Sequence, residues 1–104
     1  MAWGILVVAA LFEIAWAVGL KATEGFTRPV ATVVVIVCLI LSVTLLGMAA
    51  RTLPIGTAYA VWTGIGAIGT AAIGILWLNE PATLQRLGAL AMIVGGIVWL
   101  KAAS

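Results

Sequence analysis

The chain has 104 residues, of which 65% are hydrophobic and only 8% are charged, and its mean hydropathy is +1.34. Soluble domains carry about 25% charged residues, so the composition alone indicates a membrane protein. The sequence contains no histidine and no aspartate. We therefore expect no metal site, no cofactor and no Ser-His-Asp triad. Five basic residues against three glutamates form no basic patch, so we expect no nucleic-acid partner.

Four apolar runs follow one another along the chain, separated by short polar segments. They cover about residues 2–20, 29–50, 55–78 and 83–101. Each is about as long as a membrane-spanning helix, which needs roughly 17–25 residues. Pro29 opens the second run, and proline suits the first turn of a helix because its missing N–H would have no partner there. The pattern predicts an all-α membrane protein in which residues 1–104 form a single domain of four transmembrane helices.

The charges that flank these runs are nearly balanced across the membrane. Arg51 and Lys101 lie on the side that holds both termini, whereas Lys21, Arg28 and Arg86 lie on the opposite side. Positive residues near the ends of spans normally select the cytoplasmic side, and this bias is almost absent here. The chain is therefore predicted to insert in both orientations. Four short helices cannot enclose both a polar cavity and its walls, so we also expect a homo-oligomer.

Glu13 is the only ionisable side chain inside the first apolar run. It lies roughly 15 Å from the start of that run, near the middle of a hydrocarbon layer of about 30 Å. A carboxylate at this depth is costly, so its default interpretation is functional. No lysine, arginine or histidine lies at a similar depth within a span to neutralise it. Glu13 is then either protonated or paired with an outside cation, which outlines a proton/cation exchanger.

Other polar and aromatic side chains supply hydroxyl groups and rings at similar depths, but no cation. These residues are Trp16, Ser42, Tyr59 and Trp62. The aromatic faces would favour a delocalised organic cation near Glu13. Two of these residues also have a structural interpretation. Trp16 could be a packing or interface aromatic, and Ser42 could bond only its own helix backbone.

Glycines are dense in the third and fourth runs. Gly64 and Gly66 begin a glycine-rich stretch in the third run, where they permit either close helix packing or a hinge, and the sequence favours neither. In the fourth run Gly88 and Gly95 lie on one stripe without a polar function. This stripe predicts helix packing across a dimer interface.

Taken together, these motifs resemble the small multidrug resistance family of four-helix transporters over essentially the whole chain. Within that family the chain is most similar to the guanidinium exporter subfamily, because Trp16 follows the glutamate by three residues and because the third run contains Thr63-Gly64-Ile65-Gly66. The residues that carry the resemblance are Glu13, Lys21, residues 25–29 and residues 53–66.

The resemblance implies an antiparallel homodimer in the plasma (inner) membrane of a prokaryote, with a central pocket that opens alternately to each side. Protons and the cation would compete for the two copies of Glu13, so that inward proton flow drives cation export. Trp16 and Ser42 would hydrogen-bond and position Glu13. Tyr59 would move with the change of access, and Trp62 would form a wall of the pocket. Contacts around Gly88 to Gly96 would hold the dimer together.

Several functions stay open from the residues alone. A guanidinium ion is planar and can pair with a carboxylate through two parallel hydrogen bonds. The alternative is a multidrug exporter of quaternary ammonium and other lipophilic cations, which would depend on aromatic contact instead. A rotor-type proteolipid usually needs two helices with its acid on the second, and a structural role would make Glu13 dispensable. Enzymatic activity has no support, because no second carboxylate, histidine, lysine or arginine accompanies Glu13 at its depth within the spans.

Overall fold

The computed structural model describes residues 1–103, which form four α-helices and no strand. The helices are α1 (Ala2–Ala22), α2 (Pro29–Ala49), α3 (Ile55–Trp77) and α4 (Leu84–Ala103). All four are long and apolar enough to cross a membrane, which confirms the all-α membrane architecture predicted from the apolar runs. Helices α1 and α4 each continue two residues beyond the C-terminal end that the sequence suggested.

The connection between α1 and α2 is a tight turn built around Thr23. The Thr23 hydroxyl donates a hydrogen bond to the carbonyl of Leu20 (2.6 Å) and accepts one from the backbone N–H of Phe26 (3.2 Å). Glu24, Gly25 and Phe26 all have positive φ angles (48°, 73° and 67°), so the chain reverses within three residues. Helix α2 then starts directly at Pro29, as expected for proline in a first helical turn.

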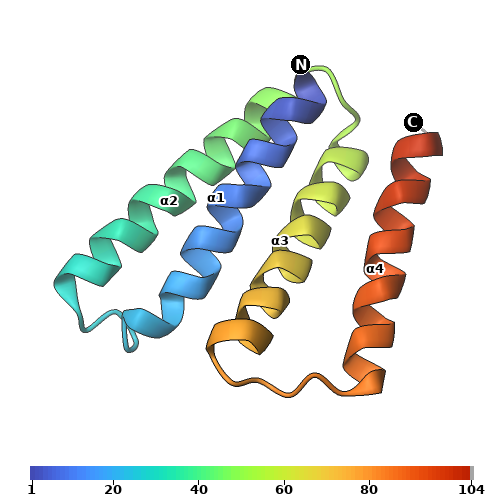
Figure 1. The fold of residues 1–104 in the computed structure, drawn as a ribbon. Coiled ribbons are helices and arrows are strands. Elements are labelled where there is room, and N and C mark those ends of the chain that lie inside the picture. The colour runs from blue at the N-terminus through green and yellow to red at the C-terminus, as the bar shows by residue number, and fades with distance from the viewer. Residues whose placement is uncertain (104) are drawn as a thin grey trace.

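The helices lie side by side in one row, in the spatial order α2, α1, α3, α4 (Figure 1). Helix α1 packs most extensively against α2 and then against α3, whereas α4 contacts α3 alone. The protein measures 41 × 35 × 16 Å, so this row is a flat slab rather than a closed bundle. Both termini lie at one end of the slab (Figure 1). The α1–α2 and α3–α4 connections lie at the other end, here called the loop end.

The buried core occupies the half of the slab nearer the termini. Its members come from the start of α1, the end of α2 and the start of α3: Leu6, Ala9, Ala10, Leu46, Ala49, Ala58, Val61 and Trp62. Alanine is frequent here because its small side chain lets helix backbones approach closely, which is how helices associate in lipid. Toward the loop end this core stops, and α1 and α3 leave a groove between them.

Candidate functional site

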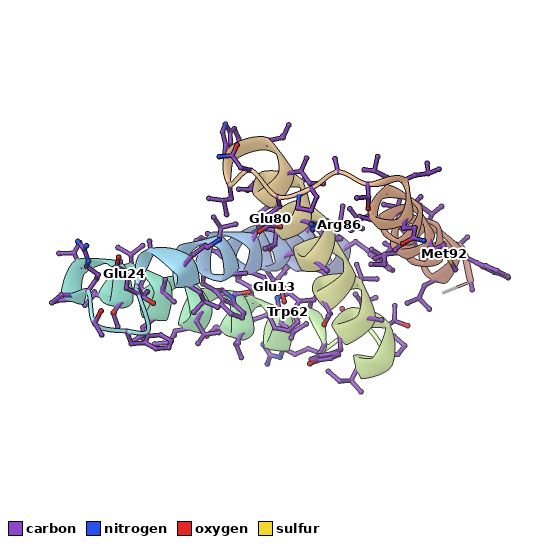
Figure 2. All side chains as sticks on the ribbon, turned by 90° about the horizontal axis from the view of Figure 1, so that it is seen from below. Glu13, Glu24, Trp62, Glu80, Arg86 and Met92 are labelled. Atoms are coloured by element: carbon purple, nitrogen blue, oxygen red, sulfur yellow. The ribbon has the colours of Figure 1, made fainter. Side chains whose placement is uncertain are left out.

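A groove of about 460 Å³ runs between α1 and α3 from the middle of both helices to the loop end. Glu13 lies at its inner end, where α1 faces α3 (Figure 2). The walls beside it are short side chains of both helices, namely Ala17, Thr63, Gly66, Ala67 and Thr70. Because these side chains are small, the groove has room for a guest beside the carboxylate.

The Glu13 carboxylate lies directly against Gly66 of α3. A Cβ atom at position 66 would overlap the Glu13 carboxyl group, so glycine is required for this approach. The Oε1 atom of Glu13 is buried and has no hydrogen-bond partner among the described residues. A buried carboxylate oxygen without a partner is costly, and either a bound proton or a bound cation would relieve that cost.

Ser42 and Trp62 form a hydrogen-bonded chain next to this groove, but not to Glu13. The Ser42 hydroxyl donates to the backbone carbonyl of Ala9 (2.7 Å) and accepts from the indole Nε1 of Trp62 (2.9 Å). Ser42 is fully buried, and its single proton is already donated to Ala9, one helical turn before Glu13. The hydrogen bond to Glu13 that the resemblance implied for Ser42 is therefore absent from the protomer, where Ser42 joins α1, α2 and α3 instead.

The other two aromatic candidates lie outside the groove lining. The indole nitrogen of Trp16 is buried without a hydrogen-bond partner, so its expected bond to Glu13 is also absent from the protomer. Tyr59 is 55% exposed and lies against Trp62, with ring centroids 5.6 Å apart and a 47° tilt. Trp62 itself is only 8% exposed and belongs to the core.

The glycines of the third and fourth helices have different surroundings. Gly64 lies against Ile97 of α4, and a Cβ there would overlap this isoleucine, just as a Cβ at Gly66 would overlap Glu13. Gly88 and Gly95 of α4 have open space around their Cβ positions in the protomer. Close packing thus accounts for Gly64 and Gly66, and α3 is one continuous helix through both.

Three polar residues of the groove were not predicted from the sequence. Thr70 has a buried hydroxyl without a hydrogen-bond partner, and it lines the groove one turn beyond Gly66. Glu80 and Arg86 form an ion pair (3.3 Å) at the loop end of the same groove. Position 70 follows position 66 at the four-residue helical spacing, which was a usable signal. The ion pair between Glu80 and Arg86, which spans Pro81, had no such signal in the sequence.

We predict that Ser42→Ala destabilises the protein by about 1–2 kcal/mol, because it leaves the Trp62 N–H unpaired in the core and removes the second hydrogen bond that the Ala9 carbonyl accepts beside its bond within α1. Unfolding in mixed micelles, followed by tryptophan fluorescence, measures this change. Thr44→Ala is the matched control, since it removes an exposed hydroxyl from the same helix. Equal stability of the two variants would show that the hydrogen-bonded chain contributes nothing.

Comparison with known proteins agrees with the four-helix membrane architecture. A family model described as "Small Multidrug Resistance protein" matches residues 1–94. The chain belongs to the small multidrug resistance family.

Three relatives that bear the name "Guanidinium exporter" match over nearly the full length of both chains. Those of Escherichia coli (strain K12) and Citrobacter freundii are each 54% identical over 101 residues, covering 97% of this chain and 96% of theirs. That of Yersinia pseudotuberculosis serotype I (strain IP32953) is 53% identical over 104 residues and covers all of both chains.

This small multidrug resistance protein is therefore a transport protein that crosses the inner membrane of a prokaryote several times. The relatives bear the name of an exporter, and the family is named for drug resistance; neither is the name of an enzyme. Both conclusions agree with the resemblance found from Glu13, residues 25–29 and residues 53–66.

Proposed function

We propose that this protein exports guanidinium in exchange for protons, by alternating access, with Glu13 of two subunits binding protons and cation in turn. The observation that carries the proposal is the Glu13 carboxylate, which lies in mid-helix with a buried oxygen that no described residue bonds. An ion-paired glutamate would have a fixed protein partner. An unpaired one can hold a proton or a cation, and the exchange of these two is the chemistry of an antiporter.

The groove supports a small cation with N–H donors rather than a quaternary ammonium ion. Guanidinium can form two parallel hydrogen bonds with a carboxylate, and hydroxyl groups such as that of Thr70 could accept a further one. A quaternary ammonium ion has no N–H groups and depends on aromatic faces. The groove walls near Glu13 are alanine, glycine and threonine, while Trp62 is buried in the core and Tyr59 lies outside the lining. The names of the relatives point the same way.

An antiparallel homodimer forms part of this proposal. Helix α4 has no buried residue and contacts only one neighbour, so its apolar side chains and the open positions at Gly88 and Gly95 would pack against a second copy. A slab only 16 Å thick cannot close a cavity around Glu13, whereas two slabs facing each other can. In the dimer the free N–H of Trp16 would donate to the central site, and the exposed Tyr59 would move as access changes.

Transport into liposomes that contain the purified protein tests the proposal. We expect guanidinium uptake driven by an outward proton gradient, that is, with protons more concentrated inside, and little inhibition by tetraethylammonium. Protein-free liposomes give the background rate. Uptake of tetraethylammonium in place of guanidinium would identify a multidrug exporter, and transport of neither ion would contradict the proposal.

A further inference from the structure

The groove holds a second carboxylate at its loop end. Glu80 lines the same groove as Glu13, together with Lys21 and Arg86. Figure 2 shows Glu80 and Arg86 beside each other at the α3–α4 connection, with Glu24 at the far side of the molecule. An ion that leaves the groove at its loop end would pass close to the Glu80 carboxylate.

The backbone holds Glu80 over the groove. Asn79 has a positive φ angle of 59°, which turns the chain back toward α3, and the Glu80 N–H donates to the carbonyl of Gly74 (3.1 Å). A Cβ at Gly74 would overlap the Glu80 carboxyl group. This repeats the arrangement of Glu13 against Gly66: both carboxylates of the groove lie against a glycine of α3.

A hydroxyl group lies between the two carboxylate positions. Gly66 and Gly74 are separated by two turns of α3, roughly 12 Å along the helix, and Thr70 lies midway between them. Its buried hydroxyl has no hydrogen-bond partner in the described part of the chain. Positions 66, 70 and 74, which contact Glu13, carry the Thr70 hydroxyl and contact Glu80, respectively, are thus spaced roughly 6 Å apart along the helix axis.

The present partner of Glu80 is itself a guanidinium group. Arg86 Nη2 contacts Glu80 Oε1 at 3.3 Å, through one nitrogen only, and both side chains are more than one third exposed. A free guanidinium ion could form two parallel bonds with the same carboxylate. Because Lys21 also lines this end, a free cation gains a counter-charge here only when it displaces Arg86.

We propose that Glu80 is a second binding site for the guanidinium cation, at the loop end of the groove, and that Arg86 is a tethered competitor for it. The cation would pass from Glu80 along Thr70 to Glu13. This inference rests on the proposed function, since it assigns the path by which the same substrate reaches Glu13.

The two halves of the ion pair then have opposite effects on transport. We expect Glu80→Gln to raise the KM for guanidinium roughly threefold to fivefold with little change in kcat, and Arg86→Gln to lower KM by a similar factor. The double variant should behave like Glu80→Gln. Gly74→Ala, which displaces the carboxylate but keeps its charge, should also raise KM. Steady-state uptake into liposomes measures all four.

Matched controls come from the other connection at the same end. Glu24 and Arg28 form an ion pair of similar type (2.8 Å) that lies outside the groove lining and is about 60% exposed. Glu24→Gln and Arg28→Gln change the same charges, and we expect both to leave KM unchanged. A shift of KM equal to that of the Glu80 and Arg86 variants would mean that surface charge alone is responsible.

A purely structural ion pair predicts a different result. Glu80→Gln and Arg86→Gln would then lower activity and thermal stability together and in the same direction, which would overturn the inference. Guanidinium binding to the Glu13→Gln protein provides a readout that does not depend on transport. Titration with guanidinium chloride should shift the carboxyl carbon resonance of Glu80. This shift should be larger in the double variant Glu13→Gln/Arg86→Gln. Absence of a shift in the Glu80 carboxyl carbon resonance would also overturn the inference. A failure of the proposed function itself appears separately, as absence of guanidinium transport by the wild type.

Discussion

Glu13→Gln should abolish proton-driven guanidinium transport. Glutamine matches the shape of glutamate but cannot ionise, so it offers neither a counter-charge for the cation nor a site for the exchanged proton. Two charge-assisted hydrogen bonds are each worth about 1.5–3 kcal/mol. Their loss corresponds to a decrease in uptake of at least roughly a hundredfold. Guanidinium uptake into liposomes with an imposed pH gradient measures the effect.

The comparison requires that the variant still folds and assembles. We expect Glu13→Gln protein to elute from size-exclusion chromatography at the same volume as the wild type, because the Glu13 side chain forms no hydrogen bond or ion pair within the described protomer. Glu24→Gln is the control, since it removes a carboxylate that is 60% exposed in the α1–α2 connection. If Glu13→Gln retained uptake that responds to the pH gradient, the central proposal would be wrong.

Gly66→Ala should impair transport without loss of stability. The added methyl group would overlap the Glu13 carboxyl group, which must then rotate out of its position between α1 and α3. Displacement of a binding group by about 1 Å can cost up to a hundredfold, so we expect guanidinium uptake at low concentration to fall roughly tenfold to a hundredfold. Alanine is a better helix former than glycine by about 1 kcal/mol, so thermal stability should not decrease.

Gly56→Ala separates this local effect from any general effect of alanine in α3. It makes the same substitution in the same helix, at a position where the added methyl group meets no atom within 4 Å. We expect its uptake and its thermal stability to equal or exceed those of the wild type. Normal guanidinium uptake by Gly66→Ala would show that transport does not depend on the contact of Glu13 with α3.

The glycines of α3 determine how near each neighbour can approach this helix. Four of them contact different partners: Gly64 meets Ile97, Gly66 meets Glu13, Gly69 meets Ile14 and Gly74 meets Glu80. Two of these contacts are with carboxylates of the groove and two are with aliphatic side chains of α1 and α4. A single helix thus supports both the packing of the slab and the geometry of the groove, so substitutions at these glycines should have distinct effects.

The amino-acid sequence alone determined the membrane architecture and the central acid. Backbone N–H and C=O groups have no water to bond within a bilayer, so an apolar run of about 20 residues can cross it only as a helix. This constraint is local, and the four runs therefore predicted the helices to within two residues at each end. Glu13 was equally visible, because an ionisable side chain alone in an apolar run is unusual in any membrane protein.

Only the tertiary structure decided which partner each polar group finds. Ser42 could have bonded its own helix or Glu13, and it bonds Ala9 and Trp62 because α1, α2 and α3 meet at that depth. Likewise, the approach of Glu80 to Gly74 depends on a reversal of the chain at Asn79. Hydropathy depends on each residue separately, whereas a hydrogen bond or a close contact depends on two positions that packing brings together.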